Sequence, residues 1–261
     1  MKKQAKGIIG NILLSLVRQP TLRASLNQVG YVCMPAYMSM LKQVDKHEDI
    51  TQYPIFGALA ESVINDKRTC LSYDRLYTIF QALRAIKDTP YANTIEVGVY
   101  KGGTSKFIVD VMMSLHPSIK LHHCAVDTFF GHDSKDILSS DSHRPGQFND
   151  TDCESVKKYL SGCNVETFQG RFEDQCHYFN DVKFHFIHLD VDLYEPTLHA
   201  LRFFSSRMAA NGIIVVDDYA NTSCDGVKEA VDKFMVESLD FMGLHLLTGQ
   251  FIMFNRKLVL L

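Results

Sequence analysis

The chain has 261 residues, 46% hydrophobic and 22% charged, which is typical of one globular α/β domain with a small addition. Its formal net charge of −3 provides no broad basic surface and therefore argues against a nucleic-acid partner. The seven cysteines are odd in number and form no CxxC pair. They disfavour a disulfide framework or a zinc knuckle and indicate a reducing cytoplasm.

The first 66 residues differ in pattern from the rest of the chain. Helical patterns there are broken by three prolines, so we expect a helical N-terminal extension over residues 1–66 and the main domain over residues 67–261. The apolar run at residues 8–14 is far shorter than the ~20 residues that span a bilayer, which argues against integral membrane association. The apolar faces of these helices suit a homodimer or a higher homo-oligomer.

Helical and strand patterns alternate from residue 72 onward. An amphipathic helix is predicted over residues 72–87, with Ser72 as its cap. Strands are predicted at 94–98, 121–127, 165–169, 184–189 and 213–216, helices at 104–115, 152–160, 195–208 and 224–238, a polar loop at 128–151, and two strands within 244–254. This alternation predicts an α/β fold with a mostly parallel seven-stranded sheet and an antiparallel C-terminal hairpin.

A glycine-rich turn, Glu96-Val97-Gly98-Val99-Tyr100-Lys101-Gly102-Gly103-Thr104-Ser105, joins the first strand to the next helix. Glycines allow the backbone to approach a ligand at a helix N-terminus, but the turn lacks the GxGxxG pattern of dinucleotide-binding proteins. Glu96 suits a ligand with an ammonium group, such as the methionine end of S-adenosylmethionine. An ordinary strand–helix turn is the alternative. The candidate ligand contacts are Glu96, Gly98, Tyr100, Gly102, Thr104 and Ser105.

Candidate contacts for the rest of such a ligand follow the next two strands. Asp127 ends the second strand, where a carboxylate can accept two ribose hydroxyls, and Thr128 and Phe129 follow it. After the third strand, Arg171 and Phe172 can flank an adenine ring. Each signal is weak alone, but ligands of open parallel sheets bind at the carboxyl ends of the strands, which is where these residues lie.

Three carboxylates end the fourth and fifth strands. Asp190 follows the fourth, and Asp217 and Asp218 follow the fifth. If these strands are neighbours, their backbones lie about 5 Å apart, and the three carboxylates converge. A cation among them would relieve their repulsion, and oxygen ligands favour Mg²⁺, with Mn²⁺ or Ca²⁺ as alternatives. The alternative interpretation is solvated loop residues or helix caps.

Asp192 lies two residues beyond Asp190, on the same side if the segment is extended. It can therefore stand beside the metal and remove a proton from a substrate hydroxyl. His132 and His143, in the polar loop, are the other candidates for the catalytic base, although loop histidines are more often merely solvated.

Taken together, these segments resemble the macrocin O-methyltransferase family. The most specific are Asp190-Val191-Asp192-Leu193-Tyr194-Glu195-Pro196-Thr197 and Asp217-Asp218-Tyr219. The others are residues 67–69, 95–103, 127–131, 170–174, 212–216 and 226–232.

The resemblance implies a Rossmann-like class I methyltransferase that depends on S-adenosylmethionine and Mg²⁺ and methylates a hydroxyl of a small-molecule acceptor, a sugar of a natural product or glycan. It assigns Asp190, Asp217 and Asp218 to the metal, Asp192 to proton removal, and Thr69, Glu96 and Asp127 to the donor; Asp190 also borders the donor. Two residues depart from the family: Val191 stands where glycine is frequent, and Cys70 where methionine is common.

Two other functions are compatible with parts of the sequence. A nicotinamide-dependent oxidoreductase is disfavoured by the missing GxGxxG pattern. A catalytically degenerate protein that only binds S-adenosylmethionine is disfavoured by the retained carboxylates.

Overall fold

The computed structural model describes residues 54–86, 89–138 and 142–256. The chain divides into two compact units, Met1–Pro54 and Ile55–Leu261, and the description below concerns the second. Most of the expected extension over residues 1–66, including the apolar run at 8–14, lies outside the described residues. The proposed boundary between extension and main domain therefore stays a prediction.

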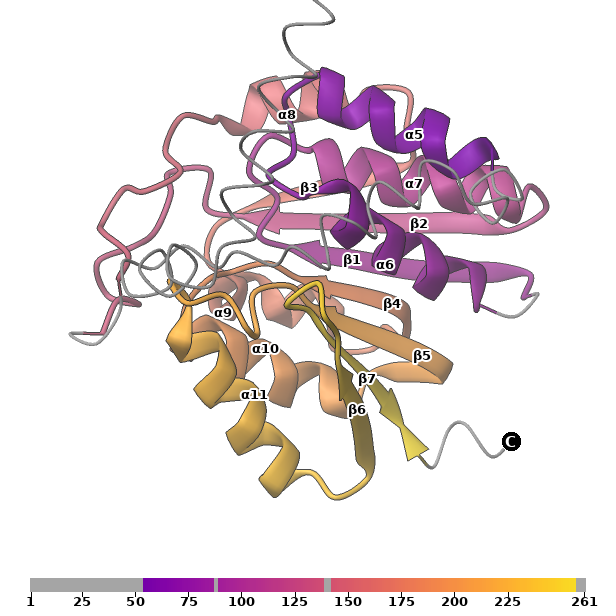
Figure 1. Ribbon diagram of the computed structural model, residues 1–261. Helices are drawn as coiled ribbons and strands as arrows, with labels where there is room; N and C mark the ends of the chain where they lie inside the picture. The colour runs from indigo at the N-terminus through magenta and orange to yellow at the C-terminus, as the bar shows by residue number, and fades with distance from the viewer. Residues whose placement is uncertain (1–53, 87–88, 139–141, 257–261) are drawn as a thin grey trace, which may run out of the picture. The chain divides into compact units, whose positions relative to one another are not determined.

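A seven-stranded sheet in the order β3-β2-β1-β4-β5-β7-β6 forms the centre of the domain (Figure 1). The first five strands are parallel, and β7 runs antiparallel to both β5 and β6. The predicted α/β fold with its antiparallel C-terminal hairpin is thereby confirmed. The strands are β1 (Tyr91–Val97), β2 (Lys120–Asp127), β3 (Val165–Gln169), β4 (Phe184–Leu189), β5 (Met208–Val216), β6 (Phe241–His245) and β7 (Phe251–Asn255).

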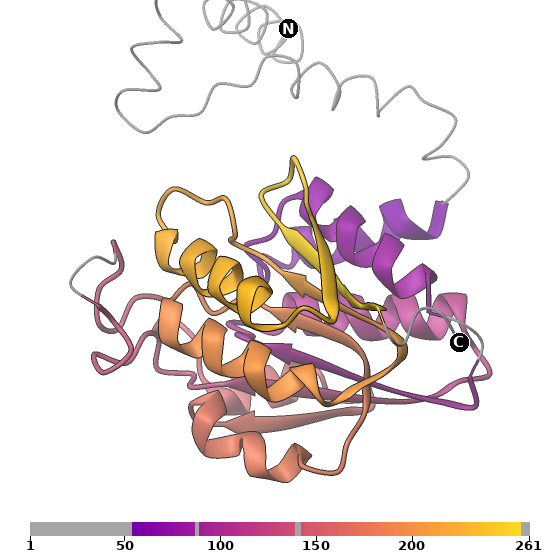
Figure 2. The same cartoon turned by 90° about the horizontal axis from the view of Figure 1, so that it is seen from below.

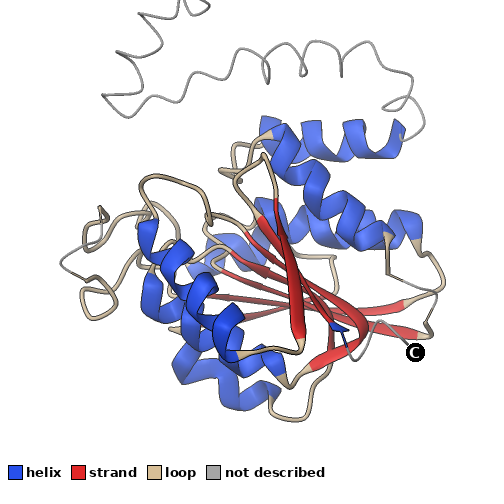
Figure 3. Cartoon of the chain, turned by 60° about the horizontal axis from the view of Figure 1, so that its bottom comes forward, coloured by secondary structure: helices blue, strands red, loops and turns tan. Residues whose placement is uncertain are grey.

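Helices cover both faces of the sheet (Figure 3). Helices α5 (Pro54–Asn65), α6 (Tyr73–Arg84) and α7 (Gly103–Leu115) lie on one side. The other side carries α9 (Phe172–Gln175), α10 (Tyr194–Ser205) and α11 (Asp225–Glu237), of which α10 and α11 run side by side (Figure 2). The remaining helices are α8 (Cys153–Tyr159) and the 3₁₀ helix η1 (Cys176–Phe179). No helix among the described residues is long and apolar enough to cross a membrane.

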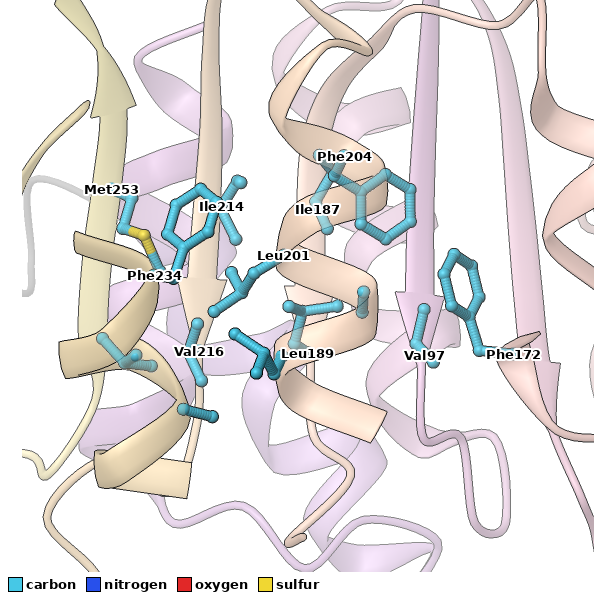
Figure 4. Close-up of a cluster of buried hydrophobic side chains, with 14 of the residues drawn as sticks. Val97, Phe172, Ile187, Leu189, Leu201, Phe204, Ile214, Val216, Phe234 and Met253 are labelled. Atoms are coloured by element: carbon cyan, nitrogen blue, oxygen red, sulfur yellow. The ribbon is translucent and has the colours of Figure 1, made fainter. Parts of the chain in front are cut away.

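An apolar core lies between the sheet and the α10–α11 face (Figure 4). Leu189 and Val216, at the ends of adjacent strands, pack with Leu201, Phe204 and Phe234 from the two helices, and all five side chains are buried. Burial of each such side chain contributes about 1.5–3 kcal/mol. This core fixes the ends of β4 and β5 beneath the loops that follow them.

Three local features differ from the sequence-based expectation. Helices α9 and η1 were not predicted, because helices of four residues are too short to show a 3.6-residue period. Strand β6 begins three residues before the predicted hairpin at residue 244. Ser72 is the N-cap residue of α6, as expected, but its side chain makes no capping hydrogen bond.

Candidate active site

The carboxyl ends of the parallel strands meet at one edge of the sheet. Val97 of β1 is in register with Val126 of β2 and with Leu189 of β4, which in turn pairs with Val216 of β5. The strand order reverses between β1 and β4, and open α/β sheets bind ligands in the crevice at such a reversal. A cleft of about 250 Å³ opens there.

Two glycines allow the turn after β1 to pack closely against its neighbours. Gly98 has a φ of 89°, and a Cβ built on it would lie 1.8 Å from the carbonyl oxygen of Asp190. Gly103 donates its N–H to the carbonyl of Arg68, and a Cβ there would lie 2.6 Å from the Arg68 backbone. The turn is therefore held between the end of β4 and the segment that precedes α6.

Nine of the thirteen predicted donor contacts line the cleft: Thr69, Gly98, Tyr100, Thr104, Asp127, Thr128, Arg171, Phe172 and Asp190. The other four, Glu96, Gly102, Ser105 and Phe129, are not among the described residues that line it. Gly102 caps α7 in a left-handed conformation, and Phe129 packs in a small apolar cluster.

Asp127 organises the glycine turn. One carboxylate oxygen accepts hydrogen bonds from the backbone N–H groups of Val99 (2.6 Å) and Tyr100 (2.8 Å), and the other accepts one from Phe129 (2.6 Å). The carboxylate at the end of β2 thus fixes the shape of the turn after β1 while it also lines the cleft.

A chain of buried polar groups lies beneath the cleft and contains Glu96. The carboxylate of Glu96 accepts a hydrogen bond from the hydroxyl of Ser105 and lies 3.0 Å from Nδ1 of His188. Nε2 of His188 is 3.7 Å from Asp217, and Nε2 of His123 is 3.1 Å from the Ser105 hydroxyl. Glu96 therefore links the glycine turn to the carboxylates at the end of β5.

The three predicted metal ligands converge. One carboxylate oxygen from each of Asp190, Asp217 and Asp218 lies within 4.8 Å of the other two. Asp217 and Asp218 are only 1% and 6% exposed. Burial and the charges of Asp218 and Asp192 raise the pKa of Asp190 well above its usual range. Burial and the charge of Asp192 likewise raise the pKa of Asp218, because neighbouring buried carboxylates disfavour one another's charged form.

Arg75 of α6 is the cation that these carboxylates face. Its guanidinium contacts Asp217 and lies 3.3 Å from Asp218. The buried Gln250 donates a hydrogen bond to Asp217 (2.7 Å), and Asn221 donates one to Asp218 (2.9 Å). None of these three partners was predicted, because the period of α6 identifies its apolar face and not the partner of Arg75, and no local pattern pairs Gln250 or Asn221 with a carboxylate.

The donor set at the end of β4 and β5 fits a hard divalent ion. All three converging groups are carboxylates, and Mg²⁺ and Ca²⁺ take oxygen ligands. The guanidinium of Arg75 already neutralises part of the charge on two of them, so a bound ion would share these carboxylates with Arg75.

Asp192 and His132 both line the cleft, with Oδ2 of Asp192 3.4 Å from Nε2 of His132. Burial alone would raise the pKa of Asp192, but hydrogen bonding with His132 and Asp218 and the charges of His132 and His143 outweigh it and lower the pKa. Asp192 has a φ of 61°. The expected extended segment was therefore wrong, although Asp190 and Asp192 do open into the same cleft.

His143 lies behind His132 and is 8% exposed. The two rings meet edge to face with centroids 4.9 Å apart. Nε2 of His143 lies 3.3 Å from Sγ of Cys224, which is itself 3.6 Å from Oδ1 of Asp192. His143 is not among the described residues that line the cleft.

The chain matches the sequence profile of the Macrocin-O-methyltransferase (TylF) family over residues 67–239. No curated protein matches it. The O-methyltransferase NovP superposes with a TM-score of 0.62 and 21% identity over 71% of this chain and 81% of NovP. The calicheamicin methyltransferase CalS11 has a TM-score of 0.55 and 19% identity over 68% and 76% of the two chains. An O-methyltransferase from Bacillus cereus in complex with SAH has a TM-score of 0.50 and 12% identity over 76% and 88%.

The fold and the matching profile define an S-adenosylmethionine-dependent O-methyltransferase with a Rossmann-like class I fold. The profile covers well over half of the 261 residues. The chain belongs to the macrocin O-methyltransferase (TylF) family.

Proposed function

We propose that this protein transfers the methyl group of S-adenosylmethionine to a hydroxyl of a sugar moiety, in a small natural product or a glycan, with Mg²⁺ held by Asp190, Asp217 and Asp218. The observation that carries this proposal is the convergence of three carboxylates in the cleft that the glycine turn also lines. The structural neighbour CalS11 is described as a TDP-rhamnose 3'-O-methyltransferase, which favours a sugar hydroxyl as acceptor.

The donor would lie along the ends of β1 and β2. Thr69 and Thr104, whose hydroxyl oxygens are 2.8 Å apart, would border its methionine end together with the glycine turn. Asp127 would meet the ribose, and Arg171 and Phe172 would border the adenine. Methyl transfer from a sulfonium depends mainly on the orientation of the acceptor oxygen. The residues at the ends of β4 and β5 would set this orientation.

The residues at the ends of β4 and β5 would bind and activate the acceptor hydroxyl. A bound Mg²⁺ would act as a Lewis acid that makes an acceptor hydroxyl more acidic. Asp192 would take the proton, because it lines the cleft and the charges of His132 and His143 favour its ionised form. His132 would orient Asp192 from 3.4 Å away. Val191, which stands where the family often has glycine, also lines the cleft and would narrow the space for the acceptor.

The metal requirement is tested with a panel of nucleotide sugars and glycosides as acceptors and S-adenosylmethionine as donor. We expect EDTA to abolish methyl transfer and added Mg²⁺ to restore it. Asp217→Asn should lose Mg²⁺ binding in calorimetry. Asp110→Asn, in α7 beside Lys106, is the control that should bind Mg²⁺ normally. Undiminished turnover in EDTA would show that the carboxylates serve another purpose.

Two further predictions concern the molecule in the cell. We propose a homodimer or higher homo-oligomer, which the exposed apolar side chains of Val236, Leu239, Leu244 and Leu247 would favour. We also propose a cytoplasmic location, because the six cysteines among the described residues are all free thiols.

A further inference from the structure

A second cluster of metal-binding side chains lies beside the carboxylates and differs from them in chemistry. His143, Asp192 and Cys224 each offer one atom within 4.8 Å of the other two. The cluster joins the loop before α8, the segment after β4 and the residue that precedes α11. Its donors are nitrogen, oxygen and sulfur, whereas the neighbouring group has only oxygen. Borderline cations such as Zn²⁺ select mixed sets of this kind.

The distances within the cluster match the edges of a zinc tetrahedron. Bonds of about 2.0–2.3 Å at tetrahedral angles separate ligand atoms by about 3.3–3.6 Å. Nε2 of His143 lies 3.3 Å from Sγ of Cys224, and Sγ of Cys224 lies 3.6 Å from Oδ1 of Asp192. Two of the three ligand–ligand edges therefore already have the required length.

The cluster is buried and incompletely satisfied. His143 is 8% exposed and Cys224 is 2% exposed. Within the described part of the chain, Nδ1 of His143 is buried and has no hydrogen-bond partner. Buried polar atoms without partners are rare in folded proteins and call for an ion or water to satisfy them.

Another mixed group in the described chain, His122, Cys124 and Glu166, is less suited to hold an ion. Glu166 is exposed, and it lies 3.1 Å from His122, which it can already satisfy as a hydrogen-bond partner. Cys124 lies 3.9 Å from the other nitrogen of His122. The burial of its histidine and cysteine, together with the unpartnered Nδ1 of His143, thus distinguishes the cluster at Asp192.

We propose that His143, Asp192 and Cys224 form a Zn²⁺ site, separate from the Mg²⁺ ligands, and that Zn²⁺ bound there inhibits methyl transfer. Binding would convert the Cys224 thiol to a thiolate and release its proton to solvent. The ion would have three protein ligands and a fourth position toward the cleft, which Asp192 and His132 line. The inhibition rests on the proposed function, because the ion would engage the carboxylate that accepts the acceptor's proton.

Binding is tested without activity, by adding Co²⁺ to the full chain with Mg²⁺ in excess. A thiolate ligand gives cobalt a charge-transfer band in the near ultraviolet that carboxylates cannot produce. We expect the intensity of this band to saturate at one equivalent of Co²⁺ and the band to disappear when Zn²⁺ displaces the cobalt. Cys224→Ser should abolish the band and weaken Zn²⁺ binding more than about 100-fold. Cys153→Ser, which replaces another buried cysteine, is the matched control and should keep it.

His143→Gln provides a second variant that retains the thiol and should also weaken Zn²⁺ binding strongly. Absence of the band in the unmodified chain, or its persistence in Cys224→Ser, would overturn the site. In methyl-transfer assays, Zn²⁺ should inhibit the unmodified enzyme despite excess Mg²⁺, and Cys224→Ser should resist inhibition. Zn²⁺ binding without inhibition would overturn the regulatory role, while failure to methylate any sugar would leave the binding result intact.

Discussion

At the scale of single residues, Asp192 combines an unusual backbone with a central place in the cleft. Its φ of 61° lies in the left-handed region, which costs most residues about 1–3 kcal/mol, although aspartate and asparagine tolerate it best. The conformation places the carboxylate between His132 and Cys224. Asn at this position therefore preserves the backbone and removes only the base.

Asp192→Asn should lower kcat about 10²–10⁴-fold, because a general base contributes that much, and should leave binding of S-adenosylhomocysteine unchanged. Steady-state kinetics and calorimetry measure the two quantities. Asp133→Asn changes another carboxylate that lines the cleft and should have little effect on kcat. A normal kcat in Asp192→Asn would instead assign the role of catalytic base to His132.

Arg75 neutralises two buried carboxylates from a different part of the chain. Arg75→Met should therefore destabilise the protein in EDTA by about 3 kcal/mol, because it leaves buried charge without a partner. Mg²⁺ should restore more stability to the variant than it adds to the unmodified protein. Urea denaturation with and without Mg²⁺ measures both effects. Arg84→Met, at the exposed end of the same helix, is the control. Unchanged stability in EDTA would mean that Asp217 needs no counter-charge.

At the scale of elements, the glycine turn depends on close backbone packing more than on glycine's flexibility. Gly98→Ala combines a φ of 89° with a Cβ that would overlap the carbonyl of Asp190. Gly162 has the same φ of 89°, but a Cβ built on it would meet no atom within 4 Å. Gly162→Ala therefore measures the cost of the backbone strain alone.

We expect Gly162→Ala to cost about 1–3 kcal/mol of unfolding free energy, and Gly98→Ala to cost clearly more and to weaken binding of S-adenosylhomocysteine. Denaturation curves and calorimetry give both numbers. Equal losses in the two variants would show that the contact with Asp190 is readily relieved.

Much of the fold followed from local pattern. Apolar runs ending in acidic residues identified β4 and β5, and neighbouring parallel strands bring such ends together, so Asp190, Asp217 and Asp218 could be grouped before any coordinates. The side chains that contact these three aspartates could not be predicted from the sequence. Arg75 and Gln250 reach Asp217 from 142 and 33 residues away, and no periodicity encodes such a pairing.

Glu96 and Asp192 show two other limits of sequence patterns. The acidic residue before the glycines was expected to meet the donor, whereas it is 1% exposed and bonded to Ser105 and His188; the donor contact stays a prediction. The left-handed backbone of Asp192 depends on the packing of the loop after β4, and an alternating pattern predicts only extended structure there.

At the scale of the whole molecule, the buried His123 makes stability depend on pH. Burial, together with the charges of His122 and His188, lowers the pKa of His123 from 6.5 to about 3. Below pH 6.5 the unfolded chain binds a proton that the folded chain excludes. The free energy of unfolding should therefore fall as the pH is lowered, by up to about 1.4 kcal/mol per pH unit from this residue.

Urea denaturation between about pH 7 and pH 5 measures this slope. His123→Asn should flatten it, even if the variant is less stable at every pH. His122→Asn, on the same strand but half-exposed, should change it far less, because burial is the main cause of the lowered pKa of His123. Identical slopes in all three proteins would assign the acid sensitivity to other groups.

The position of β7 has a consequence for how the enzyme is made. This strand, the last of the described chain, inserts between β5 and β6, pairs Phe251 with Val216, and is preceded by Gln250, which bonds to Asp217. A nascent polypeptide still lacking β7 already contains every proposed catalytic and metal-binding residue, yet Asp217 lacks its hydrogen bond from Gln250 and β5 lacks its antiparallel partner. Catalytic competence would therefore arise only after β7 has joined the sheet, and products truncated before β7 would be inert despite an intact set of active-site residues.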